Sequence, residues 1–153
     1  MKTILNFAQK AFIFNEESKI LVIKFKSNKY QNKKLAGKYG LPGGQMNLGE
    51  EPNESIIREV QEETGVEIIP SLPFYTWTWS YTKENGTHKQ IVAIARLAKY
   101  IKGDPRINMQ ENESILEDAL FISLDNLNST NFVIDEYPAI ERYLEYKSIN
   151  PFS

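Results

Sequence analysis

The sequence predicts an α+β fold in which a β-sheet and helices form the layers of one domain. The length of 153 residues suits a single domain, so residues 1–153 are expected to share one core. Segments with strand-like patterns alternate along the chain with segments of helical spacing. Charged residues make up 25% of the chain, an ordinary share that argues against a disordered or fibrous protein.

Composition also limits the chemistry and the partners of the protein. The chain has no cysteine and one histidine, His88, which excludes disulfides, thiolate nucleophiles and sites with two imidazoles. Its formal net charge of −2 provides no basic excess for a nucleic-acid backbone. No apolar run approaches the length of a membrane helix, and polar residues break Met1–Lys10, so no signal peptide is recognised. We therefore expect a cytoplasmic protein with no membrane or nucleic-acid partner, whose chemistry depends on carboxylates and a hard cation.

The first half of the chain is expected to form a hairpin, a loop and a helix. Phe7–Phe14 and Lys19–Lys26 are β-rich runs joined by a polar turn, and both faces of the second run are largely apolar. Ser27–Gly40 lacks such a pattern and is predicted to be a loop. A helix is expected to begin at Pro52, because proline suits the first helical position, and to end at Gly65.

The second half is expected to add strands and a final helix. Asn85-Gly86 is the strongest turn signal in the chain and predicts a second hairpin. The predicted strands are Val66–Ile69 (closed by Pro70), Leu72–Thr82, His88–Tyr100 and Ala119–Ser123. Helical spacing predicts a C-terminal helix whose apolar face contains Tyr137, Ile140, Tyr143 and Leu144.

The helix that begins at Pro52 carries an acidic stripe. On a helical wheel, Glu59, Glu62 and Glu63 share an arc of about 100°. The adjoining packing face is expected to hold Ile56, Ile57, Val60 and Thr64. Neighbouring like charges destabilise a helix, and Arg58, four residues from Glu54 and Glu62, can neutralise only one of them. One interpretation is that the stripe binds a divalent cation, and oxygen ligands would suit Mg²⁺ or Mn²⁺. The alternative is that the stripe is a solvated acidic face.

The same segment resembles a known sequence signature. Gly44, Glu50 and Arg58–Val66 match the Nudix box at every fixed position, and nearly the whole chain is similar to a Nudix domain. The resemblance implies an α/β/α sandwich with a central mixed sheet, in which residues 52–64 form the catalytic helix. It also implies Mg²⁺-dependent hydrolysis of a nucleoside diphosphate linked to another group X, with water attacking phosphorus.

The resemblance implies roles for individual residues. Metal-binding positions of the family are matched by Glu59, Glu62, Glu63 and the carbonyl of Gly43. The positions that orient these carboxylates are matched by Glu50 and Arg58. The general base is left open between a helix glutamate and the acidic loop that contains Glu113, the first choice there, and Glu117. The alternative for that loop is an ordinary solvated segment.

Two segments are candidates for binding the other end of the substrate. Six lysines, among them Lys38, and no acidic residue lie between positions 24 and 40, and this loop could attract a polyphosphate. Strict alternation places Tyr75, Trp77, Trp79 and Tyr81 on one face of a strand, where a nucleobase could stack. The alternatives are solvated lysines and an aromatic face that belongs to the core or to a homodimer interface.

The substrate itself is left open at the level of sequence. A nucleoside triphosphate, a nucleotide sugar and a dinucleoside polyphosphate all satisfy the resemblance. A non-catalytic domain that senses nucleotides is the alternative function, although such domains have usually lost glutamates that this chain keeps. The isomerase branch of the family needs a reactive cysteine, which this chain does not have.

Overall fold

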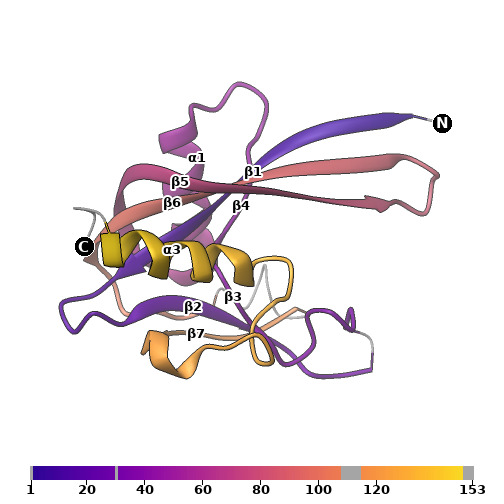
Figure 1. Cartoon of the computed structure of the whole chain (residues 1–153). Coiled ribbons are helices and arrows are strands. Elements are labelled where there is room, and N and C mark those ends of the chain that lie inside the picture. The colour runs from indigo at the N-terminus through magenta and orange to yellow at the C-terminus, as the bar shows by residue number, and fades with distance from the viewer. Residues whose placement is uncertain (1, 30, 108–114, 150–153) are drawn as a thin grey trace.

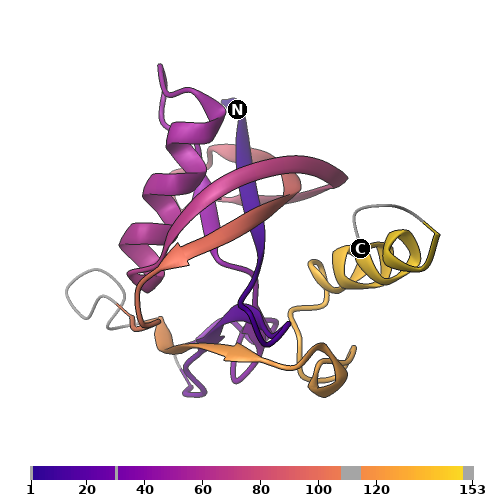
Figure 2. The same cartoon turned by 90° about the vertical axis from the view of Figure 1, so that its left-hand side faces the viewer.

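A curved mixed sheet lies between two helices in the computed structural model, and Figures 1 and 2 show α1 and α3 on opposite sides of it. The structure describes residues 2–29, 31–107 and 115–149. The strands are β1 Thr3–Phe14, β2 Ile20–Phe25, β3 Tyr39–Gly40, β4 Gly43–Gln45, β5 Glu67–Thr82, β6 His88–Lys102 and β7 Leu116–Ile122. The helical segments are α1 Pro52–Thr64, the short 3-10 helix η1 Leu124–Asn126 and α3 Tyr137–Ile149. The predicted α+β class is confirmed.

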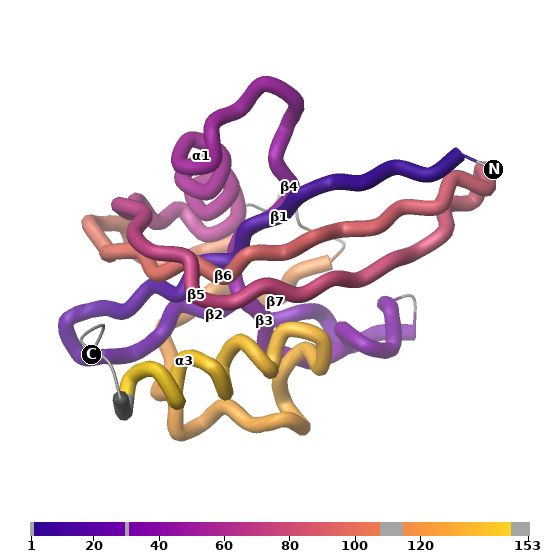
Figure 3. The backbone as a smooth tube through the Cα atoms, turned by 45° about the horizontal axis from the view of Figure 1, so that its top comes forward, coloured from indigo at the N-terminus to yellow at the C-terminus, as the bar shows by residue number. Residues whose placement is uncertain are grey.

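Strand β1 organises the sheet, whose order is β3-β2-β1-β6-β5, with β4 paired to β1 and β7 paired to β2. It runs parallel to β6 from Thr3↔His88 to Phe14↔Lys99, and antiparallel to β2 and β4. In Figure 3, β1, β6 and β5 run side by side towards the end of the sheet that carries the N-terminus. The pairing with β4 places Lys10 opposite Gly43, which brings a strand of the sheet next to the glycine turn.

Both faces of the central strands are apolar, as predicted for β2, because each face is covered. On the side of α3, Ile20 and Val22 pack in a buried cluster with Phe12 and Ile140. On the side of α1, Leu21 lies in a second cluster with the buried residues of that helix. Within the described residues, no helix has both the length and the apolar character that a membrane crossing requires.

The structure corrects the predicted ends of several elements. Pro70 does not close a strand, because β5 continues through it with register shifts between Pro70 and Pro73 and between Pro73 and Tyr75. As β5 is at one end of the strand order, proline's missing N–H can face away from the neighbouring strand. The predicted loop of residues 27–40 contains β3 near its end, and Leu144 of α3 is 45% exposed rather than on the packing face.

Candidate active site

Helix α1 has the predicted bounds and presents its acidic stripe beside the sheet. Pro52 is at its start and Gly65 follows its last residue. Ile56, Val60 and Thr64 are fully buried, as predicted. Ile57 is 36% exposed, which corrects the prediction that it packs, because the sheet covers the stripe of the other three and Ile57 lies at its far edge.

The glycine turn lies very close to both β1 and α1. Gly43 has a φ of 136°, and a Cβ atom there would collide with the carbonyl oxygen of Gln9 on β1. A Cβ atom on Gly44 would lie 2.5 Å from the Oε2 atom of Glu59. The backbone of β4 therefore lies directly against a carboxylate of α1.

Arg58 holds several carboxylates of the site through its guanidinium. Its Nε and Nη2 donate to the two oxygens of Glu50 at 2.7 and 2.9 Å. Its Nη1 donates to Glu62 Oε2 at 3.0 Å and lies 3.1 Å from Glu59 Oε1. The hydrogen bonds from Arg58 are the largest cause of the lowered pKa of Glu50, about 2. Of the two helix partners proposed from spacing, Glu54 and Glu62, the ion pairs of the described residues include only Glu62.

Glu63 and Glu59 are the more enclosed carboxylates of the stripe. Glu63 Oε1 accepts the backbone N–H of Gly43 at 3.0 Å. Burial raises the pKa of Glu63 to about 7, and the positive charge of Lys10 offsets part of this effect. Burial likewise raises the pKa of Glu59, against the opposing effect of Arg58. Both groups are carboxylates whose ionised form would gain from a cation.

Glu59, Glu62 and Glu63 come from the acidic stripe of α1, but their carboxylates do not all gather at one point. Within the described residues, no group of three or more acidic or histidine side chains is close enough together to hold a metal ion. Glu62 has a 43% exposed side chain drawn to Arg58, whereas Glu63 turns to the Gly43 amide. The groups that could coordinate a metal ion here nonetheless all offer oxygen atoms. Because residue 44 is a glycine, no side chain from the turn crowds the Glu59 carboxylate. Oxygen donors of this kind suit a hard cation. Such an ion could be held by Glu59, Glu63 and the Gly43 carbonyl. Glu62 could join this set if its carboxylate moved away from Arg58.

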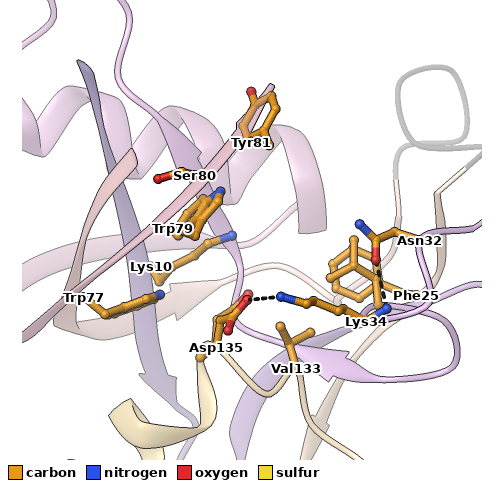
Figure 4. Close-up of a pocket in the computed structure, with 12 residues that line it drawn as sticks. Lys10, Phe25, Asn32, Lys34, Trp77, Trp79, Ser80, Tyr81, Val133 and Asp135 are labelled. Carbon is orange, nitrogen blue, oxygen red and sulfur yellow. Dashed lines mark hydrogen bonds and ion pairs between the residues drawn. The ribbon is translucent and has the colours of Figure 1, made fainter. Parts of the chain in front are cut away.

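Beside the turn lies a cavity of about 420 Å³, which we call the aromatic cavity. Three of the four predicted stacking residues line it, namely Trp77, Trp79 and Tyr81. Figure 4 shows the two indole rings on one side and Asp135 and Lys34 opposite them. The Nε1 atom of Trp77 is buried without a hydrogen-bond partner. The remaining lining residues are Lys10, Phe25, Asn32, Leu35, Ser80, Val133 and Glu136.

Other predicted site residues lie elsewhere. The ammonium of Lys38 donates to the carbonyl of Thr130, and the lysine of that loop which lines the aromatic cavity is Lys34. Glu117 pairs with Lys24 at 3.5 Å. Glu113 lies outside the described residues.

Two charged residues of the site, Lys10 and Glu136, were not predicted from the sequence. Lys10 is in the interior of β1, between Gln9 and Ala11, and belongs to no helical or motif spacing. Glu136, immediately before α3, is 7% exposed, and its Oε1 accepts the N–H of Leu41 at 2.8 Å. Burial raises the pKa of Glu136, with Lys10 acting in the opposite direction. In the sequence, a carboxyl directly before a helix indicates only the start of that helix, so the burial of Glu136 could not be predicted.

The raised pKa of Glu63 predicts a pH-dependent stability in metal-free protein. A carboxyl whose pKa is near 7 in the folded state and about 4.5 in the unfolded state stabilises the fold below the lower value and loses that effect as pH rises through the upper one. Between pH 4.5 and 8, wild type should lose at most about 3 kcal/mol of unfolding free energy relative to Glu63→Gln. Urea unfolding with a chelator present measures this difference, and parallel pH curves for the two proteins would contradict the prediction.

Comparisons with known proteins agree with this geometry. A family model for the NUDIX domain matches residues 6–143. An ADP-ribose pyrophosphatase of Methanocaldococcus jannaschii is 29% identical over 136 residues, which are 89% of this chain and 72% of the relative. A MutT protein of Methanosarcina mazei has a similar fold, with a TM-score of 0.73, 23% identity and coverage of 96% of this chain and 98% of the other. A MutT NUDIX hydrolase of Burkholderia pseudomallei has a TM-score of 0.62 and 27% identity, with coverage of 91% of this chain and 98% of the other. Since the matched segment includes the glycine turn, α1 and the strands of the aromatic cavity, the chain belongs to the Nudix family.

Proposed function

We propose that the protein hydrolyses a diphosphate linkage in a nucleoside diphosphate linked to X, in a reaction that depends on Mg²⁺, with Mn²⁺ as a substitute. Depending on the identity of X, the substrate would be a nucleoside triphosphate, a nucleotide sugar or a dinucleoside polyphosphate. The observation that carries the proposal is the pair of enclosed carboxylates, Glu59 and Glu63, against the backbone of Gly43 and Gly44. The pyrophosphatase name of the 29% identical relative supports the same bond type.

The metal would be held by Glu59, Glu63 and the carbonyl of Gly43, with Glu62 as a further ligand. When bound, a dication neutralises the charge that develops on the phosphate oxygens and assists attack by water. The positioning of the carboxylates falls to Arg58, which is itself fixed by the two hydrogen bonds to Glu50. Loss of that pair would allow Glu59 and Glu62 to turn away from the substrate.

The reaction needs a group that accepts a proton from water. As the water oxygen bonds to phosphorus, the bond from phosphorus to the leaving phosphate oxygen breaks, and the proton passes to a carboxylate. Among the carboxylates of the helix trio we favour Glu62 for this role, because Glu62 is exposed whereas Glu59 and Glu63 are partly buried. Glu113 and Glu117 of the acidic loop are the alternatives, and Glu117, like Glu62, is paired with a basic side chain.

A panel of nucleoside polyphosphates and nucleotide sugars, incubated with Mg²⁺ and analysed by mass spectrometry, tests this function. We expect products separated at a diphosphate linkage, one of which identifies X. The contacts of Arg58 with both Glu59 and Glu62 favour a second candidate, a domain that binds nucleotides without cleaving them. Binding with no turnover on any member of the panel would support that candidate and reject the hydrolase.

Mg²⁺ should raise the melting temperature of the protein, because it binds the folded state and not the unfolded chain. At a hundred times its dissociation constant the ion should add about 2.7 kcal/mol of stability. Differential scanning fluorimetry over millimolar Mg²⁺, with nucleoside diphosphate present, measures the shift. Glu59→Gln is the control and should respond weakly. A wild-type melting temperature that stays constant would reject the metal site.

A further inference from the structure

We infer that Lys10 binds a phosphate group of the substrate at the junction between the aromatic cavity and the carboxylates of α1. The inference rests on the proposed function and adds a substrate-binding residue to it. Lys10 reaches this junction because β1 pairs with β4, with Lys10 opposite Gly43. In Figure 4 its side chain extends past Trp79 towards the middle of the aromatic cavity.

The ammonium of Lys10 makes only long contacts in the structure. Its Nζ lies 3.5 Å from the carbonyl oxygens of both Leu41 and Gly43. A charge-assisted hydrogen bond from an ammonium to an anionic oxygen is normally about 2.7–2.9 Å long. The ion pairs found among the described residues include none to Lys10 within 4.0 Å. A group with three N–H donors in a partly enclosed position therefore retains its capacity for a short bond to an anion.

The charge of Lys10 acts on both parts of the site. It opposes the rise in pKa of Glu59 and Glu63 on α1, and it does the same for Glu136 on the cavity side. Lys10 also lines the aromatic cavity together with both tryptophans. A ligand whose ring lies against Trp77 and Trp79, and whose diphosphate reaches the helix, must pass this ammonium.

The chemistry of the ligand at this point follows from these contacts. A phosphate oxygen is anionic and projects from a tetrahedral centre. It can therefore accept a hydrogen bond from the Lys10 ammonium in place of the distant carbonyl oxygens of Leu41 and Gly43. A neutral sugar hydroxyl would gain much less from a positive charge. The phosphate bound by Lys10 would be the one nearest the ring, since those farther along reach the carboxylates of α1. A lysine that served only as a counter-charge to Glu63 and Glu136 would not distinguish a phosphorylated ligand from an unphosphorylated one.

Tryptophan fluorescence can test this distinction without any turnover. The chain has two tryptophans and both line the aromatic cavity, so quenching reports on that cavity directly. The probes are pairs of a nucleoside and its 5′-monophosphate, which contains no diphosphate linkage to hydrolyse. Wild type should bind each monophosphate more tightly than its nucleoside. Lys10→Met should reduce this preference about tenfold or more while nucleoside binding is unchanged, and Lys10→Arg should keep most of it.

Lys99→Met, an exposed position on β6, is the matched control for the loss of one positive charge and should keep the preference. Three results would overturn the inference: a wild type without preference for the phosphate, a Lys10→Met protein that keeps it, and a Lys10→Met protein that loses nucleoside binding equally. The last would show a purely structural role. Absence of turnover on the substrate panel would reject the hydrolase separately, because this binding measurement does not depend on it.

Discussion

Replacing Glu62 or Glu63 by glutamine is expected to lower kcat/KM for the substrate on the order of a hundredfold or more, without loss of stability at neutral pH. Each change removes one anionic oxygen pair from the proposed metal-binding set while keeping the size of the side chain. Glutamine at 63 can still accept the hydrogen bond from the Gly43 N–H at 3.0 Å. Glutamine at 62 is accommodated on the exposed edge of α1.

The two variants should differ in a second measurement. Glu63 is enclosed and proposed to bind the metal directly, so Glu63→Gln should also weaken the melting-temperature response to Mg²⁺. If Glu62 acts mainly as the base, Glu62→Gln should keep most of that response and lose turnover. The measurement combines steady-state kinetics with scanning fluorimetry on the same preparations.

Glu54→Gln is the control for these variants, because Glu54 is exposed on the first turn of the same helix. It should retain wild-type kinetics, which would show that loss of negative charge from α1 is not sufficient to explain the effect. Wild-type turnover in both Glu62→Gln and Glu63→Gln would reject the catalytic assignment of the acidic stripe.

The helix was predictable from sequence because its signals are local. Proline at the start, glycine at the end and a three-to-four-residue spacing of apolar side chains depend only on helix geometry, and α1 has the predicted bounds. The pairing of Arg58 with Glu62 follows from the same geometry. The pairing with Glu50 crosses from the helix to the preceding loop, and the family resemblance alone indicated it.

The rest of the site depends on contacts between distant segments. Lys10 reaches the glycine turn only because β1 pairs with β4, and the N–H that Glu136 accepts belongs to Leu41, 95 residues away in the sequence. Pro70 signals the end of a strand, yet the end position of β5 in the sheet allows the strand to continue. No periodicity within one segment contains this information.

Substitution by alanine should lower mainly stability at Gly43 and mainly turnover at Gly44, the two adjacent glycines of the turn. Gly43→Ala should destabilise the fold by about 3 kcal/mol or more, because it adds a Cβ against the Gln9 carbonyl at a φ of 136°. Gly44→Ala should cost far less stability, since its Cβ meets the movable carboxylate of Glu59 and its φ is outside the left-handed region. That carboxylate must shift, so turnover should fall at least tenfold while the protein remains folded.

Gly49→Ala separates backbone strain from steric collision, because its φ is 88° and a Cβ there has no neighbour within 4 Å. It should lose only about 1–2 kcal/mol, the usual cost of a left-handed conformation. Urea unfolding ranks the three variants, and kinetics at a temperature where all are folded measures the site. If Gly44→Ala is as active as wild type, the contact between the turn and Glu59 does not position that carboxylate for catalysis. If Gly43→Ala is no less stable than Gly49→Ala, the close approach of β4 to β1 is not what requires glycine.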